Sequence, residues 1–163
     1  MIARFALVAM IFGLLSAPAV PQTQPQPYTF DVVINQSGQN AYVGSLYATV
    51  FRVFEKYINS HGALNGRPVH FELHDDQTNV QTAVQLAAGI IAKHPVVMFG
   101  GTQTAACAAI AALVKNGPVD FCISPGYFPE RGSYAFASSA SLHYIISGEL
   151  KFLRLKGYRR VAV

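Results

Sequence analysis

The sequence contains no tryptophan, only two cysteines and few acidic residues. Its 163 residues include eight Asp and Glu against twelve Lys and Arg, so charged residues make up 12% and the formal net charge is +4. A charge this small, clustered only between Lys151 and Arg160, does not indicate nucleic-acid binding, and we interpret the cluster as a solvated helix face. With 52% hydrophobic residues, the chain is far from disordered composition and can form one α/β domain.

The motifs that mark common enzyme and nucleotide sites are also missing. No strand is followed by G-x-G-x-x-G, and G-x-x-x-x-G-K-[ST] does not occur, which argues against nucleotide binding. Ser124 lacks the G-x-S-x-G setting of a hydrolase nucleophile. The adjacent Asp75 and Asp76 point to opposite sides of a strand end, so we expect them to cap a loop rather than form an acid–base pair. The sequence predicts no catalytic residue and no cofactor.

The cysteines and histidines do not predict a metal site. Cys107 falls in an Ala-rich helix and Cys122 in the following strand; export would permit a disulfide, but we expect two small buried apolar groups instead. His70, Glu72 and His74 share one face of a strand and could present metal ligands together. Because no fourth ligand lies nearby in the sequence, we interpret them as the polar face of an edge strand.

The apolar run at the N-terminus is too short to cross a membrane. It covers eleven residues from Phe5 to Leu15, about 16 Å of helix against a hydrocarbon core of about 30 Å. Arg4 precedes it and Ala17-Pro18-Ala19 follows, which is typical of a secretory signal peptide. We predict a cleaved signal peptide over 1–19, export to the periplasm, and a flexible Pro/Gln-rich lead-in over 20–27.

From residue 28 the sequence alternates short β-branched or aromatic runs with longer helical patterns, which predicts βαβ units on a parallel sheet. The fold class is therefore α/β, a three-layer doubly wound parallel sheet. The predicted helices cover 43–60, 80–92, 105–116 and 142–156. The predicted strands cover 30–35, 67–74, 96–99, 119–123, 134–137 and 158–163.

Ligands of an open parallel sheet bind beyond the carboxyl ends of its strands. Three segments follow strands in this way: 36–40, 100–104 and 124–127. The middle one is the most specific, because its two glycines let a ligand approach the backbone, while helix amides and the hydroxyls of Thr102 and Thr104 face it. Such a helix N-terminus attracts a carboxylate or phosphate. An ordinary loop with threonine caps is the alternative.

Four segments resemble, in order and spacing, the leucine-binding type of branched-chain amino-acid receptors of ABC importers, which have the type I periplasmic-binding-protein fold. They are YINSHGALNGRPVHFELHDDQTNVQTAV, VVMFGGTQTAACAAI, ISPG and LKFLRLKGYRRVAV. The resemblance implies a first ligand-binding lobe over 28–136. Over 137–163 it implies the crossover helix and first strand of an incomplete, truncated second lobe.

The resemblance also implies a function. It predicts a non-enzymatic periplasmic receptor that delivers an amino acid or similar small carboxylate to the membrane permease of an ABC importer. A ligand-sensing domain of a signalling or regulatory system with the same fold is the alternative. Because closure about a hinge needs two lobes, we expect weak or no ligand affinity from this chain alone.

The resemblance names the residues of the site. Thr104 matches the family's ligand-binding serine or threonine, and Thr102 and Gln103 support it. Tyr127 and Phe128 stand where the family often has a small residue and a threonine, which leaves aromatic, amide and other small carboxylate ligands open. The complete expected site, without metal, consists of Thr104, Gln103, Thr102, Gly126, Tyr127, Ser37 and Tyr42.

Overall fold

A computed structural model of the chain describes residues 26–138, 140 and 142–160. The predicted signal peptide and most of the predicted lead-in lie outside these residues. No helix in the described ranges is long and apolar enough to cross a membrane. The strands are β1 (Tyr28–Ile34), β2 (Val69–Asp75), β3 (Val97–Gly100), β4 (Val119–Cys122) and β5 (Ala135–Ala137). The helices are α1 (Ala41–Ser60), α2 (Val80–Ile91), α3 (Thr104–Ala111) and α4 (Leu142–Leu155).

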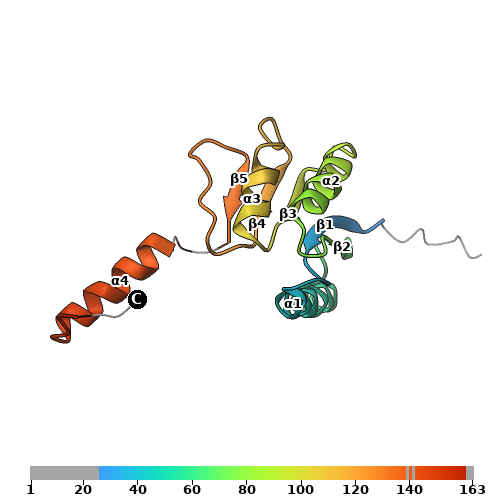
Figure 1. Cartoon of the computed structure of the whole chain (residues 1–163). Coiled ribbons are helices and arrows are strands. Elements are labelled where there is room, and N and C mark those ends of the chain that lie inside the picture. The colour runs from blue at the N-terminus through green and yellow to red at the C-terminus, as the bar shows by residue number, and fades with distance from the viewer. Residues whose placement is uncertain (1–25, 139, 141, 161–163) are drawn as a thin grey trace, which may run out of the picture.

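The strands form one parallel sheet in the order β2-β1-β3-β4-β5. The chain runs outward from β1 to β2, then crosses back over β1 and continues in the other direction, so its winding reverses between β1 and β3. Helix α1 covers one face of the sheet, and α2 and α3 cover the other (Figure 1). This confirms the predicted doubly wound α/β fold, and β2 lies at an edge as expected.

Alternation along β1 divides the core between the two faces. Val32 and Ile34 pack with α1, whereas Val33 packs with α2 and α3. All three are fully buried, which explains why β1 is a nearly continuous apolar run. On the α1 side, aromatic rings fill the space between helix and sheet, with Phe51 and Phe71 centred 5.0 Å apart.

The two cysteines form a disulfide, so our expectation of two free thiols was wrong. The pattern placed both residues correctly in the interior, since each is 0% exposed. Cys107 faces inward from α3 and Cys122 faces the same helix layer from β4. Their Cα atoms are 5.7 Å apart, within the range that a disulfide spans.

The C-terminal elements differ from the prediction. Helix α3 ends at Ala111 rather than 116. Beyond Ala111 the backbone forms turns with hydrogen bonds between residues three apart, from Leu113 N to Ile110 O and from Gly117 N to Val114 O. The strand expected over 158–163 is not formed at 158–160, and the remaining positions lie outside the described residues. Helix α4 stands away from the sheet (Figure 1).

Candidate functional site

The carboxyl ends of β1, β3 and β4 lie at one edge of the sheet, because these three strands are parallel neighbours. The segments that leave them are 35–40, 101–103 and 123–126. The structure therefore brings together the three segments that the sequence analysis selected. We define this edge as the polar edge, formed by these segments and the first turn of α3.

Asn35 connects two segments of the polar edge. Its side chain is buried at the end of β1, where Nδ2 donates to the carbonyl of Asn40 at 2.8 Å. Its Oδ1 accepts the hydroxyl of Thr102 at 2.6 Å. Because the Thr102 hydroxyl donates its hydrogen to Asn35, its oxygen can only accept a hydrogen bond from a ligand. Thr102 is thus oriented as a hydrogen-bond acceptor, which suits a cationic donor such as an ammonium group.

Thr104 and Ser124 connect α3 with the end of β4. Their hydroxyl oxygens are 3.1 Å apart, with Thr104 exposed and Ser124 buried. Gly126 leaves the space that this pair needs, since an added Cβ would come within 2.5 Å of Thr104 Oγ1. Thr104 therefore lies on the surface of the polar edge, and the buried Ser124 contacts its hydroxyl.

The first turn of α3 supplies backbone donors next to these hydroxyls. Gln103 is the N-cap residue in extended conformation, and its side chain makes no capping hydrogen bond. The first intrahelical bond runs from Cys107 N to Gln103 O at 2.9 Å. The amides of 104–106 precede it and have no partner within the helix, so they form an anion-attracting end.

The loop after β1 forms one rim of the polar edge and is fixed by the loop after β2. Ser37 N donates to the Asp75 carboxylate at 3.0 Å, and Thr78 Oγ1 donates to Ser37 O at 2.8 Å. Burial acts to raise the pKa of Asp75, but hydrogen bonds from Ser37 and Gln77 outweigh it and lower the pKa overall. Asp76 accepts from Thr78 N, which confirms that the two carboxylates cap a loop.

A sequence model of the periplasmic binding protein family matches residues 28–147, which include all segments of the polar edge. The chain belongs to the periplasmic binding protein family. Members of this family are non-enzymatic receptors, in agreement with the missing catalytic motifs. A comparison with curated proteins found no match.

Solved structures of other periplasmic binding proteins share the fold. A leucine-binding protein from Thermotoga maritima superposes with a TM-score of 0.64 at 14% identity, over 77% of this chain and 36% of that one. A branched-chain amino acid transporter substrate-binding protein from Streptococcus pneumoniae, in complex with isoleucine, gives 0.61 at 17%, over 71% and 34%. An amino acid ABC transporter substrate-binding protein from Pseudomonas fluorescens gives 0.60 at 22%, over 81% and 36%. This chain thus spans about a third of their length, the extent of one lobe.

Two expected site residues of this periplasmic binding protein, Tyr42 and Tyr127, form no hydrogen bond with the hydroxyls of Thr102, Thr104 and Ser124. Tyr42 is 76% exposed near the start of α1. Tyr127 is half-buried in the wall of a separate pocket of about 580 Å³ beside α3, which Ala108 and Phe128 also line. Burial, followed by the charges of Asp120 and Glu130, raises the pKa of the Tyr127 hydroxyl. The structure brings Thr104 and Gly126 into direct proximity, next to Thr102 and Gln103 in the chain, whereas the contacts of Ser37 are with Asp75 and Thr78 at the rim of the polar edge.

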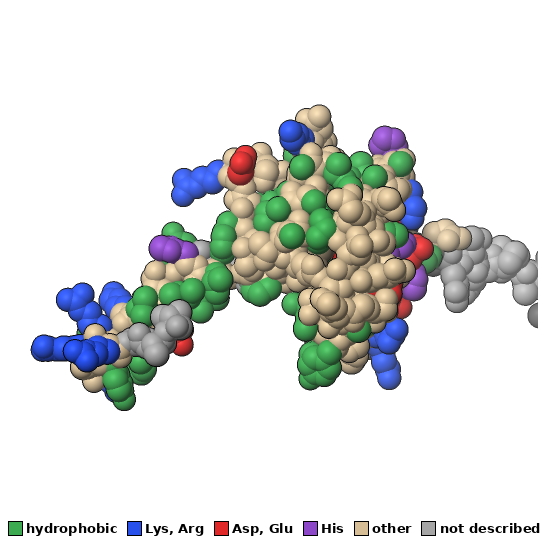
Figure 2. All heavy atoms as spheres, in the orientation of Figure 1, with side chains coloured by type: hydrophobic (Ala, Val, Ile, Leu, Met, Phe, Trp, Pro, Cys, Tyr) green, Lys and Arg blue, Asp and Glu red, His purple; other side chains and the backbone are tan. Residues whose placement is uncertain are grey.

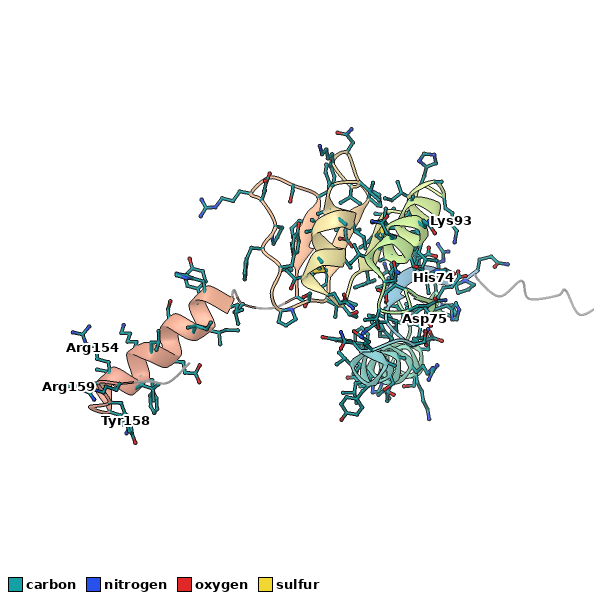
Figure 3. All side chains as sticks on the ribbon, in the orientation of Figure 1. His74, Asp75, Lys93, Arg154, Tyr158 and Arg159 are labelled. Atoms are coloured by element: carbon teal, nitrogen blue, oxygen red, sulfur yellow. A yellow bond between two sulfur atoms is a disulfide. The ribbon has the colours of Figure 1, made fainter. Side chains whose placement is uncertain are left out.

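A second polar cluster of the periplasmic binding protein lies around the middle of β1. His74 Nε2 and Lys93 Nζ contact the same oxygen of the buried Asp31, at 2.8 and 3.1 Å. Figure 3 shows His74 on β2 and Lys93 just after α2. Asp31, Glu72 and His74 are close enough to share a metal ion, but the Lys93 ammonium already supplies a cation there. The hydrogen bond to Asp31 raises the pKa of Lys93.

Sequence reasoning missed three residues that organise this periplasmic binding protein. The sequence predicts Asn35 as the last residue of a strand. It places Ser124 in the candidate segment 124–127 but assigns it no role in the site. A polar residue that ends a fully apolar run is the signal that could have found Asn35, because a buried carboxamide needs partners. Asp31 carries the same signal inside β1.

Proposed function

We propose that this chain forms the first ligand-binding lobe of an extracytoplasmic receptor that binds an amino acid or a related small carboxylate. In the whole protein, the receptor passes its solute to the membrane permease of an ABC importer. The observation that carries the proposal is the arrangement of donors and acceptors at the polar edge. Membership of the periplasmic binding protein family supports the same conclusion.

The polar edge complements the two charged groups of an amino acid. The amides of 104–106 and the Thr104 hydroxyl can donate to a carboxylate. Thr102 is fixed as an acceptor by its bond to Asn35, so its oxygen can accept a hydrogen bond from the α-ammonium group. Ser124 is placed to orient Thr104. Donors and an acceptor side by side favour a zwitterion over a simple anion such as phosphate.

Two observations support the location outside the cytoplasm. The pattern at residues 1–19 predicts a signal peptide. The structure pairs Cys107 and Cys122 in a disulfide, and disulfides form and persist in oxidising compartments such as the periplasm. Each observation is independent of the ligand site.

The ligand proposal is tested by NMR titration of the chain with leucine and isoleucine. We expect backbone amide shifts within 101–106 and 123–126. The dissociation constant should be in the millimolar range, about −4 kcal/mol, because a single lobe covers only one side of a ligand. Isovalerate, which lacks the ammonium group, should bind more weakly than leucine. The proposal fails when neither amino acid shifts these amides up to its solubility limit.

A matched pair of variants tests the role of Thr104. Thr104→Val removes a hydroxyl at the polar edge, whereas Thr49→Val removes one on the surface of α1, where it bonds only to Ser45 O. We expect Thr104→Val to weaken leucine binding by about fivefold or more and Thr49→Val to leave it unchanged. Equal affinity of both variants for leucine would show that Thr104 is not part of the site.

A further inference from the structure

The disulfide joins α3 to the end of β4, next to the polar edge. Cys107 follows Thr104 by three residues, so both lie along the same side of the first turns of α3. Cys122 precedes Ser124 by two residues at the end of β4. The sulfur bridge and the Thr104–Ser124 contact of 3.1 Å therefore close a small ring between helix and strand.

Apart from the disulfide, α3 is held on its inward side, where Ala106 and Ile110 pack in the core cluster that α2 also lines. The helix has eight residues, about 12 Å, and its buried residues are Ala106, Cys107 and Ile110. Two of these are small, so they bury little apolar area, and Gln103 provides no side-chain cap. The backbone adds one tie, from Ile123 N to Gly101 O at 3.1 Å. Gly101 also lies against the helix, because a Cβ there would come within 2.8 Å of Cys107 N.

We propose that Cys107 and Cys122 are positioning residues for ligand binding: their disulfide holds the first-turn amides and Thr104 at the distance from Ser124 that the ligand requires. The inference rests on the proposed function for its ligand, but not for its structural part. Both cysteines are fully buried, so a ligand at the surface does not reach them. They act through Thr104 and the amides of 104–106. Because the disulfide holds these groups in place, the free chain already has them in the arrangement that binds the ligand.

The first test measures amide hydrogen exchange in the full chain, without ligand. The Cys107→Ala/Cys122→Ala variant is compared with Ile90→Ala, which opens a cavity at the far end of α2. Both are measured at temperatures equally far below their own melting points. We expect exchange at the hydrogen-bonded amides of 107–110 in α3 and of Ile123 to be about tenfold faster or more in the cysteine variant only. Equal exchange in the two variants would overturn the proposal.

The second test measures leucine binding by the same three proteins. We expect the dissociation constant to rise by about tenfold in the cysteine variant and to stay near the wild-type value in Ile90→Ala. Unchanged affinity in the cysteine variant would overturn the positioning role. When the wild type itself shows no leucine-dependent shift, the proposed function fails, and the exchange experiment still decides whether the disulfide positions α3.

Chemical reduction gives a route that does not depend on the variant folding. Dithiothreitol transfers two electrons and two protons to the Cys107–Cys122 bond, which yields two thiols and the cyclic oxidised dithiol. The reduced wild-type chain should show the same local exchange increase at the amides of 107–110 and of Ile123. Reduction that leaves these amides as protected as in the oxidised chain would contradict the proposal.

Discussion

At the scale of single residues, Asp120 is the most unusual group in the described part of the chain. It lies in the middle of β4, is 0% exposed, and neither carboxylate oxygen has a hydrogen-bond partner there. Burial raises its pKa to about 7. Gly100 on the neighbouring strand gives it space, since a Cβ there would approach Oδ1 within 2.7 Å. The folded protein therefore keeps this carboxyl protonated at mildly acidic pH.

The raised pKa of Asp120 predicts that stability falls as pH rises. The folded state holds a proton that the unfolded state, with a pKa near 3.8, has released. This contribution is fully present below pH 3.8 and is lost as pH rises to about 7, with a total of the order of 4 kcal/mol. Asp120→Asn should flatten this slope in urea unfolding measured from about pH 4 to about pH 8.

Asp75→Asn is the matched control for the Asp120 prediction, because the pKa of Asp75 is lowered instead. Its contribution is present above pH 3.8 and is lost as pH falls through the folded pKa, so this variant should alter only the acid limb. A slope between pH 4 and pH 7 that persists in Asp120→Asn would show that Asp120 does not carry the titration.

Gly126 gives a prediction about the polar edge alone. In Gly126→Ala the new methyl group would approach Thr104 Oγ1 within 2.5 Å, and the flexible hydroxyl can rotate away. We expect the Thr104–Ser124 contact to break with a loss of stability of no more than about 1 kcal/mol. Leucine-dependent amide shifts at 104–106 should decrease while the urea midpoint changes little. A large loss of stability with unchanged shifts would contradict this expectation.

At the scale of elements, local patterns predicted most of the fold. The short β-branched and aromatic runs correspond to observed strands, and the polar face that His70, Glu72 and His74 share is found on β2. The errors came from tertiary context. The end of α3 depends on turns after Ala111, and the disulfide depends on how that helix lies over β4, neither of which is encoded in a local period.

Two glycines in helices give opposite predictions for the same substitution. Gly44 lies where α1 crosses the end of β1, and a Cβ there would fall within 1.8 Å of the carbonyl of Asn35. Gly89 lies on the exposed side of α2 with nothing within 4 Å of an added Cβ. We expect Gly44→Ala to destabilise the protein by about 3 kcal/mol or more, because backbone must move. Gly89→Ala should stabilise it by about 0.5 to 1 kcal/mol through helix propensity.

Urea unfolding of both glycine variants checks this pair. The contrast isolates close packing from helix propensity, because both positions are in the interior of a helix and receive the same methyl group. Equal effects of the two substitutions would mean that α1 does not approach β1 as closely as the structure shows. Since Asn35 is at the contact, Gly44→Ala should also disturb the Asn35–Thr102 bond at the polar edge.

At the scale of the whole molecule, the polar edge depends on contacts between distant parts of the chain. Asn35 and Thr102 are 67 residues apart, and Thr104 and Ser124 are 20 apart. The sequence identified the segments, because parallel strands place their carboxyl ends together. It could not pair individual side chains across strands, since that requires the strand order and register. For this reason the sequence analysis did not select Asn35 and Ser124, whereas the resemblance to the family named Thr104.

Helix α4 is the least integrated element of the described structure. It stands apart from the sheet (Figure 1), and hydrophobic side chains are exposed along it (Figure 2). These include Tyr144, Ile146, Leu150, Phe152 and Leu155, each at least 45% exposed. A helix of 14 residues without a packed face is only marginally stable in water.

We therefore predict that α4 contributes little to the stability of the lobe. A chain ending at Ser138 should unfold at the same urea concentration as the full chain, because the sheet and its two cores lie before that residue. It should also bind less of the apolar dye ANS, since the exposed side chains of α4 are gone. In the full chain, the amides of 146–155 should exchange far faster than those of β1. A lower urea midpoint for the shortened chain would show instead that α4 packs against the lobe in solution. The amides of α4 in the full chain would then exchange slowly.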